Sequence, residues 1–450
     1  MERTYWNMEI ESILNTPRMR ELQLSKIQRL VKRLYEAKPF WRQWLDQARV
    51  RPEDITSLDE FARRVPVFDK AQRRKVAEEC RFDMAEVVDR TISVPLEDVV
   101  LMAATSGMTG EPTPYPFTRN DLAWLSEGIT RVAWRMGIRP QSRVVFAFGL
   151  SMFFAGIPYV ISLQKLGCLV IPVGAEAGTE RILRYARHFK PDTLCCTPSL
   201  AEHLIEKAPE LIGTEVGDLG IRRLFCAGEP GAGIPEVKAR IESAYRAKLY
   251  DHGAGLGVSC DHEEYQGMHF VGEDLWYYEL VDQETHEPVP FVDGAVGIPV
   301  HTMLEGEGLL TLRESIGDVA QVFTEPCACG KTGFRYRVLG RTDDMLKVKG
   351  VMVYPAAIDG VISRFIPRVT GEFRIVLDEP PPRVVPPLRL KIEHGESAKQ
   401  EELGALAQEI EEKLNSKLKV SPRVEWVAPN TLERSTHKTK FIEKAYERKK

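Results

Sequence analysis

The middle of the chain alternates between apolar runs of strand length and amphipathic stretches of helix length. Residues 143–148, 168–173 and 193–196 form apolar runs, and segments with helical spacing separate them. Apolar strands separated by helices are typical of a parallel sheet covered by helices on both faces. This pattern predicts an α/β fold in which ligands bind near the carboxyl ends of the strands.

Other patterns flank this region. Residues 20–48 carry apolar positions at helical spacing, which predicts helices packed on the main domain, and we assign them no chemistry. Residues 274–312 contain alternating runs and turn signals, which predict antiparallel strands. An amphipathic helix is predicted at 398–418. We therefore expect a large N-terminal domain (1–340) of parallel and mixed sheets with flanking helices and a small antiparallel part, followed by a small mobile α/β domain (341–450).

Composition narrows the class of protein. With 450 residues, of which 43% are hydrophobic, the chain exceeds what one compact core usually organises. The 61 Lys and Arg against 65 Asp and Glu give no basic excess for a nucleic-acid surface. No apolar run approaches the roughly 20 residues of a membrane span, and the first residues lack the apolar core of a signal peptide. We expect a cytoplasmic enzyme with reduced cysteines and no membrane or nucleic-acid partner.

A loop rich in glycine and hydroxyl side chains follows an apolar run. Residues 104–118 read ATSGMTGEPTPYPFT. Glycines let backbone N–H groups turn toward one point and hydroxyls add donors, so the loop can cradle phosphate oxygens. It is not a Walker A loop, and turns of this composition are also common between strands. The candidate phosphate-binding residues are Thr105, Ser106, Gly107, Thr109 and Gly110.

Five segments, in order, resemble a known family. The loop resembles the phosphate loop of adenylate-forming enzymes, and residues 195–204, 227–231, 340–355 and 434–443 resemble segments of the phenylacetate–CoA ligases within that group. The resemblance implies the adenylate-forming enzyme fold and an ATP-dependent carboxylic acid–CoA ligase that works through an acyl-adenylate and releases AMP and pyrophosphate. It suggests an aromatic or arylacetic acid as substrate. ATP/AMP, Mg²⁺ and CoA are the implied cofactors, and because relatives are often dimers, a homodimer is expected.

The resemblance also implies residue roles at the nucleotide. The backbone at Gly228, Glu229 and Pro230 would lie against the adenine, where small residues let a purine approach the main chain. Asp251 belongs to a second nucleotide segment. Asp318 would accept hydrogen bonds from both ribose hydroxyls, which suits a carboxylate with two acceptor oxygens.

Three further residues are implied in catalysis and domain movement. Arg341 would reach the nucleotide, and Asp343 would be the pivot of a hinge between the two domains. Lys438 matches the lysine that contacts the α-phosphate and the carboxylate during adenylation, with Lys440 as the alternative. A basic C-terminus is otherwise typical of a solvated chain end.

The acid pocket is expected past the ends of the parallel strands. Helix–sheet packing is the competing explanation for these residues. The candidates are Phe148, Gly149, Ala155, Gly156, His252 and Gly253.

One segment departs from the family pattern. Residues 250–257 match a segment that usually reads Tyr-Asp-x-Tyr-Gly-x-Ser/Thr-Glu, but Gly257 stands at the place of the Glu that normally helps to hold magnesium. Three explanations remain open. The triphosphate and water hold the metal, Glu263 or Glu264 supplies the carboxylate, or the adenylation step is slow or altered.

Two pairs of soft ligands form a candidate zinc site. Cys260 and His262 make one pair, Cys327 and Cys329 the other, and His269 is a substitute ligand. Together they can build a tetrahedral Cys3His site that fastens two loops, and four protein ligands leave no open position for catalysis. Relatives with a similar cysteine cluster suggest a structural zinc, whereas four reduced, unliganded residues are the alternative.

Two rival functions remain. The missing Glu favours an adenylate-forming enzyme with a non-CoA acceptor, such as an amine, a hydroxyl or a carrier protein. A degenerate nucleotide-binding protein without turnover is the second rival. Lys438, Asp318 and Arg341 count against it.

Overall fold

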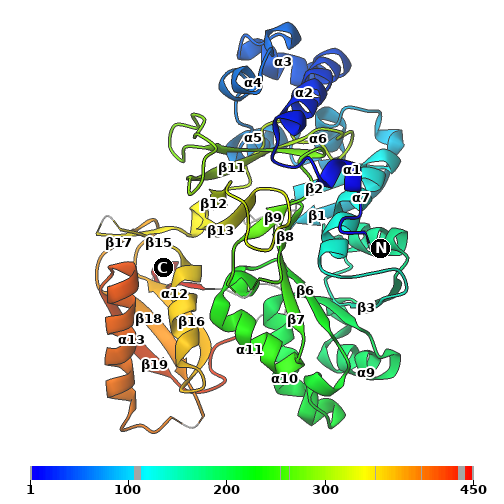
Figure 1. The fold of residues 1–450 in the computed structure, drawn as a ribbon. Helices are drawn as coiled ribbons and strands as arrows, with labels where there is room; N and C mark the ends of the chain where they lie inside the picture. Colours follow the sequence, from blue (N-terminus) through cyan, green and yellow to red (C-terminus); the bar gives the residue numbers. More distant parts are fainter. Residues whose placement is uncertain are drawn as a thin grey trace.

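The computed structural model describes residues 3–105, 113–253, 255–262, 264–349, 351–396, 398–433 and 441–447. A five-stranded parallel sheet lies in the lower part of the large domain in Figure 1, as the alternating pattern predicts. Its strand order is β4-β3-β5-β6-β7. The strands are β3 (Arg143–Phe146), β4 (Leu169–Pro172), β5 (Thr193–Cys196), β6 (Arg223–Ala227) and β7 (Lys248–His252).

Helices cover both faces of this sheet, which explains the apolar runs within its strands. Along β3, Val144 and Phe146 join one buried cluster, whereas Val145 joins the other. Successive side chains of a strand point to opposite faces, so each face receives an apolar set. The covering helices are α7 (Arg119–Arg135), α8 (Ile157–Leu166), α9 (Thr179–Phe189), α10 (Pro198–Ile212) and α11 (Pro235–Tyr245).

A six-stranded, largely antiparallel sheet packs beside it in the order β10-β11-β12-β13-β9-β8. This confirms antiparallel strands within 274–312 and adds neighbours from both sides of that range. Its strands are β8 (Gly257–Ser259), β9 (Met268–Phe270), β10 (Trp276–Val281), β11 (Val296–Met303), β12 (Asp318–Phe323) and β13 (Arg335–Arg341). A separate antiparallel hairpin, β1 (Val99–Thr105) and β2 (Thr113–Thr118), flanks the predicted phosphate loop.

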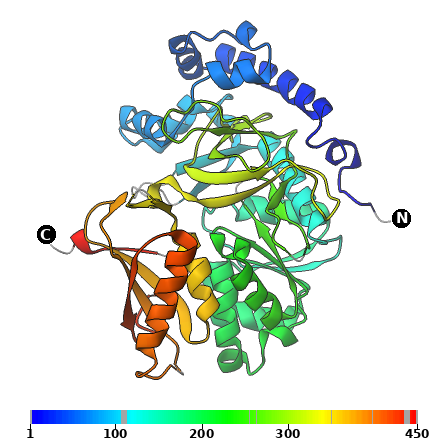
Figure 2. The same cartoon turned by 60° about the vertical axis from the view of Figure 1, so that its left-hand side comes forward.

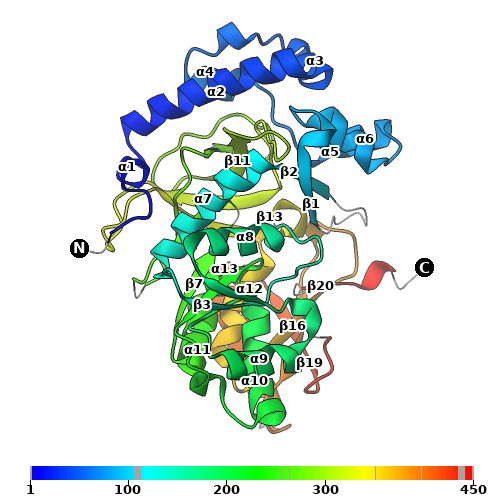
Figure 3. The same cartoon turned by 90° about the vertical axis from the view of Figure 1, so that its right-hand side faces the viewer.

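The N-terminal helices lie across one end of the molecule, at the top in Figures 1 and 3. The helical pattern at 20–48 corresponds to two helices, because Lys38 precedes a proline and is extended (φ −129°, ψ 132°). Their apolar stripe packs on Leu304 and Leu312 of the large domain. The helices are α1 (Met8–Glu11), α2 (Pro17–Ala37), α3 (Pro39–Gln47), α4 (Leu58–Arg64), α5 (Lys70–Glu79) and α6 (Met84–Thr91).

The C-terminal part has an apolar core of its own and lies to the left of the parallel sheet in Figure 2. A four-stranded sheet, β19-β18-β16-β20, and a three-stranded sheet, β15-β14-β17, contribute to it. Its elements are β14 (Leu346–Val348), β15 (Val351–Val353), α12 (Pro355–Ile362), β16 (Val369–Leu377), β17 (Arg383–Val384), β18 (Leu388–His394), α13 (Leu403–Leu418), β19 (Pro422–Val427) and β20 (Ile442–Lys444). Among the described residues, no helix combines the length and apolarity needed to cross a membrane.

Candidate active site

The predicted adenine segment lies at the carboxyl ends of β6 and β7. Gly228 follows β6 with φ +95°, a conformation that favours glycine, and Pro230 opens a short 3-10 helix (Pro230–Gly233). Glu229 Oε1 accepts a hydrogen bond from Ser199 N (2.6 Å) at the start of α10. A carboxylate is favoured at a helix N-terminus, so this contact fixes the turn next to the expected adenine.

Asp251 lies one strand further on and is buried. Its Oδ2 accepts a hydrogen bond from the Tyr265 hydroxyl at 2.8 Å. Burial raises the pKa of Asp251 to about 7, although the Tyr265 hydrogen bond opposes that shift. Asp251 is therefore a carboxyl whose charge changes near neutral pH, at the strand end where the nucleotide is expected.

The predicted ribose and hinge residues are brought together at the other side of the site. Asp318 begins β12 and is the register partner of Arg341 on β13. Arg341 Nη1 donates to Asp318 Oδ1 (2.9 Å) and Nη2 to Ile316 O (2.9 Å). Nη2 also lies 3.6 Å from Asp343 Oδ2. Arg341 thus links the residue expected to bind ribose to the expected pivot.

The predicted acid-pocket residues gather in an aromatic cluster between β3, β6, β7 and α8. Phe148 and His252 each pack edge-on against Phe225, with ring centroids 6.0 and 5.1 Å away. His252 Nδ1 donates to Gly257 O (2.7 Å), because a carbonyl can only accept. Its Nε2 therefore accepts from the Tyr159 hydroxyl (2.7 Å). Burial lowers the pKa of His252 to about 4, so the imidazole is neutral at physiological pH.

The small residues of the predicted pocket allow close backbone packing. Gly156 caps α8, and a Cβ there would come within 2.6 Å of Gly149 O. Ala155 is buried beside it. Gly253 directly follows β7 and packs against the Met268 side chain. The structure brings all six predicted residues to one side of the parallel sheet, and the contacts of these small residues equally satisfy helix–sheet packing.

The departure at Gly257 has a structural counterpart. Gly257 begins β8, and a Cβ at this position would overlap the hydroxyl and ring of Tyr336. Tyr336 is only 1% exposed. The space that the family's Glu side chain would need is thus filled by a buried phenol. Glu264 is exposed and its backbone N–H donates to His262 Nδ1, while Glu263 lies outside the described residues.

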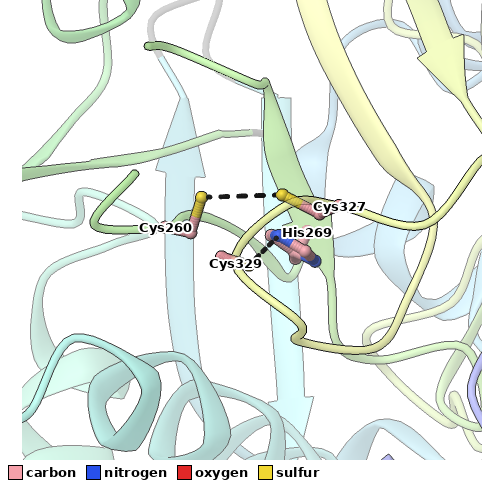
Figure 4. Close-up of side chains that lie close together, drawn as sticks. All are labelled: Cys260, His269, Cys327 and Cys329. Atoms are coloured by element: carbon pink, nitrogen blue, oxygen red, sulfur yellow. Dashed lines mark hydrogen bonds between the residues drawn. The ribbon is translucent and has the colours of Figure 1, made fainter. Parts of the chain in front are cut away.

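Three cysteines and one histidine converge on one point (Figure 4). The ligand atoms of Cys260, His269, Cys327 and Cys329 all lie within 4.8 Å of one another. Cys260 and Cys327 Sγ are 3.9 Å apart, and His269 Nε2 is 3.3 Å from Cys329 Sγ. The histidine in this cluster is the substitute ligand, His269, and not His262, whose Nδ1 accepts from its own loop.

The chemistry of this cluster fits a metal. His269 Nδ1 donates to Thr332 O (3.0 Å), which leaves the Nε2 lone pair directed at the cysteines. A hydrogen bond from Cys329 is the largest cause that lowers the pKa of Cys260 to about 3, against the effect of burial, and it favours the Cys260 thiolate. Thiolate and imidazole in a tetrahedral set of four are the usual ligands of structural zinc.

Several predicted residues fall outside the described part of the chain: Ser106, Gly107, Thr109, Gly110, Lys438 and Lys440. The flanks of the phosphate loop are described. Thr105 pairs with Thr113, and Ala104 N donates to Met152 O (2.5 Å), next to the acid-pocket residues. The hairpin therefore delivers both ends of the loop to the carboxyl-end side of the parallel sheet.

Sequence reasoning did not identify three residues that contact the site and its surroundings, two from α5 and one from α8. Lys70 forms an ion pair with Asp343, and Arg73, one turn later, pairs with Glu314. Tyr159 holds His252. At α5 the sequence indicates only a basic helix, and at α8 only the start of a helix. The contacts themselves could not be predicted, because each joins segments that are far apart in the chain.

Comparisons with known proteins identify the family. Residues 350–444 match the family described as AMP-binding enzyme C-terminal domain. The phenylacetate-coenzyme A ligase of Thermus thermophilus is 33% identical over 82% of this chain and 80% of its own length. The Escherichia coli phenylacetate-coenzyme A ligase is 30% identical, over 78% of each chain.

Solved structures define the class. 2-Hydroxyisobutyryl-CoA ligase in its postadenylation state, in complex with R3-HIB-AMP, matches with a TM-score of 0.89 and 29% identity, over 99% of this chain and 93% of that one. The same ligase in its thioesterification state, with 2-HIB-AMP and CoA, covers 100% of this chain and 95% of that one at a TM-score of 0.70. The fold is that of an adenylate-forming enzyme, and the similar proteins make the chain an AMP-forming acid–CoA ligase. Within that class, the chain belongs to the phenylacetate–CoA ligase family.

Proposed function

We propose that this enzyme activates an aromatic or arylacetic acid with ATP and transfers the acyl group to CoA. The observation that carries the choice of acid is the ring cluster of Phe148, Phe225 and neutral His252 beside the predicted pocket. Apolar and aromatic walls favour an aryl group over a charged one. Two relatives that are 33% and 30% identical are phenylacetate-coenzyme A ligases, which supports the same choice.

The proposed reaction runs in two steps. The acid's carboxylate attacks the α-phosphorus of ATP, and pyrophosphate leaves as the acyl-adenylate forms. The chain's contribution is positioning and charge neutralisation: Asp318 holds the ribose, the turn at Gly228 and Glu229 flanks the adenine, and Lys438 approaches the α-phosphate and the carboxylate. The C-terminal part then turns about Asp343, and the CoA thiol displaces AMP to give the thioester.

We assign Mg²⁺ to the triphosphate and water. ATP chemistry of this kind uses the ion to neutralise phosphate charge. Because Tyr336 fills the space beside Gly257, the described residues do not reproduce the family's Glu ligand there. No step of the proposed mechanism depends on a protein ligand for this ion.

We also propose a structural zinc held by Cys260, His269, Cys327 and Cys329. The ion would fasten the loop after β8 and strand β9 to the connection between β12 and β13. Its role is stability, since four protein ligands leave no position for a substrate. Further proposals that rest on the resemblance are a domain boundary at 340/341, a homodimer and a cytoplasmic location.

An acid-dependent ATP–pyrophosphate exchange screen tests the proposed function. The panel contains phenylacetate, benzoate, hydroxybenzoates, 2-hydroxyisobutyrate and short aliphatic acids. We expect exchange with an aryl acid and a thioester product when CoA is added. Exchange followed by equal product yields with hydroxylamine and CoA would favour a non-CoA acceptor. ATP binding without exchange for any acid would favour a nucleotide-binding protein without turnover.

Lys438→Ala separates the two steps. If this lysine neutralises charge only during adenylation, the variant loses acid-dependent pyrophosphate release by about a hundredfold or more. Thioester formation from supplied acyl-adenylate and CoA stays near the wild-type rate. Lys440→Ala is the matched control on the same segment. Equal loss of both half-reactions in Lys438→Ala would contradict this role.

A further inference from the structure

Helix α5, in the N-terminal helical region, reaches the expected hinge. Lys70 is the first residue of α5, and its Nζ forms an ion pair with Asp343 Oδ2. Lys70 and Asp343 are separated by most of the large domain in sequence. A contact between the first turn of this helix and the pivot therefore ties the N-terminal region to domain movement.

The position of Lys70 is fixed by its surroundings. Residues 67–69, just before α5, run beside the strand-like segment 313–315: Phe68 N donates to Arg313 O (2.9 Å) and Ser315 N to Phe68 O (3.1 Å). Asp69 caps the helix by accepting from Gln72 N (2.9 Å). α5 therefore starts at a set place relative to the segment that leads to Asp318.

Arg73 anchors the helix one turn later. It forms an ion pair with Glu314, which is 4% exposed. Its guanidinium also lies over the rings of Phe68 (6.0 Å) and Tyr115 (5.9 Å), and Tyr115 belongs to the hairpin that carries the phosphate loop. Buried pairing and cation–π contact keep α5 in register with both nucleotide-binding segments.

The backbone around Gly317 admits Lys70. Gly317 has φ +84°, and a Cβ there would lie 3.3 Å from Lys70 Nζ. Gly317 O accepts from Thr342 N (2.8 Å) and Thr342 Oγ1 (3.1 Å), which holds the start of the hinge. Asp343 thus has two cations beside it, Lys70 from the N-terminal region and Arg341 from its own strand end.

The arrangement of the two parts of the chain belongs to one stage of the proposed cycle. The whole-chain match is higher to the postadenylation state of 2-hydroxyisobutyryl-CoA ligase (TM-score 0.89) than to its thioesterification state (0.70). A hinge residue absorbs a change in its backbone angles when domains turn, and such a change at Asp343 would move its carboxylate relative to α5.

We infer that Lys70 is a positioning residue that holds Asp343 and biases the hinge toward the adenylation side of the cycle. The inference rests on the proposed function, because it requires a two-step reaction with domain rotation. Removal of Lys70 lowers the population of the observed arrangement relative to the thioesterification arrangement. Adenylation should then become slower while thioester formation does not, a difference that a loss of folding cannot produce.

Paired assays of the half-reactions test this inference. Acid-dependent pyrophosphate release reports adenylation, and supplied acyl-adenylate with CoA reports thioester formation. The side chains are 46% and 34% exposed, so the pair is modest in strength, and Lys70→Ala should slow adenylation by about two- to fivefold. Thioester formation should be unchanged or faster. Lys70→Arg should keep both rates at the wild-type level. Lys70→Glu should slow adenylation more than Lys70→Ala does, because its negative charge repels Asp343.

Arg74→Ala is the matched control. Arg74 lies on the same helix, is 65% exposed, and pairs with Glu78 at 2.8 Å. It should leave both half-reactions at wild-type rates. The inference is overturned if Lys70→Ala has wild-type rates in both half-reactions. It is also overturned if Lys70→Ala slows both half-reactions by the same factor. Wild-type enzyme without acid-dependent pyrophosphate release overturns the proposed function instead, so the two failures are distinguishable.

Discussion

At the scale of single residues, Gly257 and Tyr336 show how a lost side chain is replaced by packing. A Cβ on Gly257 would overlap the Tyr336 hydroxyl and ring, and Tyr336 is buried among aromatic neighbours. Interiors are close-packed, so an added methyl group forces side chains and backbone to shift. The glycine is therefore required by the phenol, and restoring a carboxylate here needs more than one substitution.

This packing predicts the stability of two glycine variants. Gly257→Ala should lower the free energy of unfolding by about 1–3 kcal/mol through overpacking. Gly404→Ala is the control: it lies in α13 with no atom within 4 Å of an added Cβ, and should raise the free energy of unfolding by up to about 1 kcal/mol. Denaturant unfolding of both variants checks the difference. Equal stabilities would contradict the overlap.

Single residues also show where sequence reasoning stops. The types and approximate positions of the cysteine cluster were predictable from the spacing of Cys260, Cys327 and Cys329. The choice between His262 and the substitute ligand His269 was not predictable, because His262 is nearer to Cys260 in the chain while the register of β9 places His269 at the cluster. Spacing identifies candidate ligands on a turn, but the pairing of strands distant in sequence selects among them.

At the scale of elements, the zinc proposal makes a testable distinction between these two histidines. If zinc is bound as proposed, His269→Ala should lose it and lower the thermal midpoint, because the ion would join the loop after β8 and strand β9 to the β12–β13 connection. His262→Ala should keep zinc and stability. Metal analysis of purified protein and thermal unfolding with and without a chelator measure both. Zinc loss from His262→Ala, or one zinc per chain in His269→Ala, would contradict the assignment.

The elements themselves follow local patterns well. Alternation of apolar strands and helices predicted the parallel sheet, and helical spacing predicted α2, α3 and α13. α13 begins at Leu403 instead of 398, since residues before it form turns. The placement of α5 was beyond such patterns. Its contacts with Glu314 and Asp343 depend on how the N-terminal region lies across the large domain. The local periodicity of apolar residues does not determine that placement.

At the scale of the whole molecule, the C-terminal part contacts the large domain through α12. An added Cβ at Gly360 of α12 would be 3.7 Å from Ile234, and Arg364 Nη2, in the 3-10 helix directly after α12, lies 2.5 Å from Glu236 Oε1 on α11. Asp359 precedes Gly360 in α12, and its Oδ1 accepts from the Ser363 hydroxyl (3.1 Å). The face that meets α11 thus carries a carboxyl group whose surroundings change when the two parts separate.

We expect Asp359 to make the docking of the two parts depend on pH. Burial raises its pKa to about 7, while Ser363 and Arg240 lower it and Glu372 and Glu229 raise it. Exposed in the rotated state, the carboxyl should titrate near its ordinary value of about 4. The docked state therefore binds the proton more tightly: its advantage is complete below about pH 4 and is lost as pH rises through about 7.

The ratio of the two half-reactions measures this linkage. In the proposed mechanism adenylation uses the docked arrangement, so its rate relative to thioester formation from supplied adenylate should fall as pH rises from about 5 to about 7 and level off above about 7. Asp359→Asn carries no titrating charge and should flatten that dependence. Asp378→Asn, whose carboxyl is exposed and pairs with Arg389, is the control and should follow wild type. An unchanged profile in Asp359→Asn would assign the pH dependence to another group, with Asp251 the next to test because its pKa also lies at about 7.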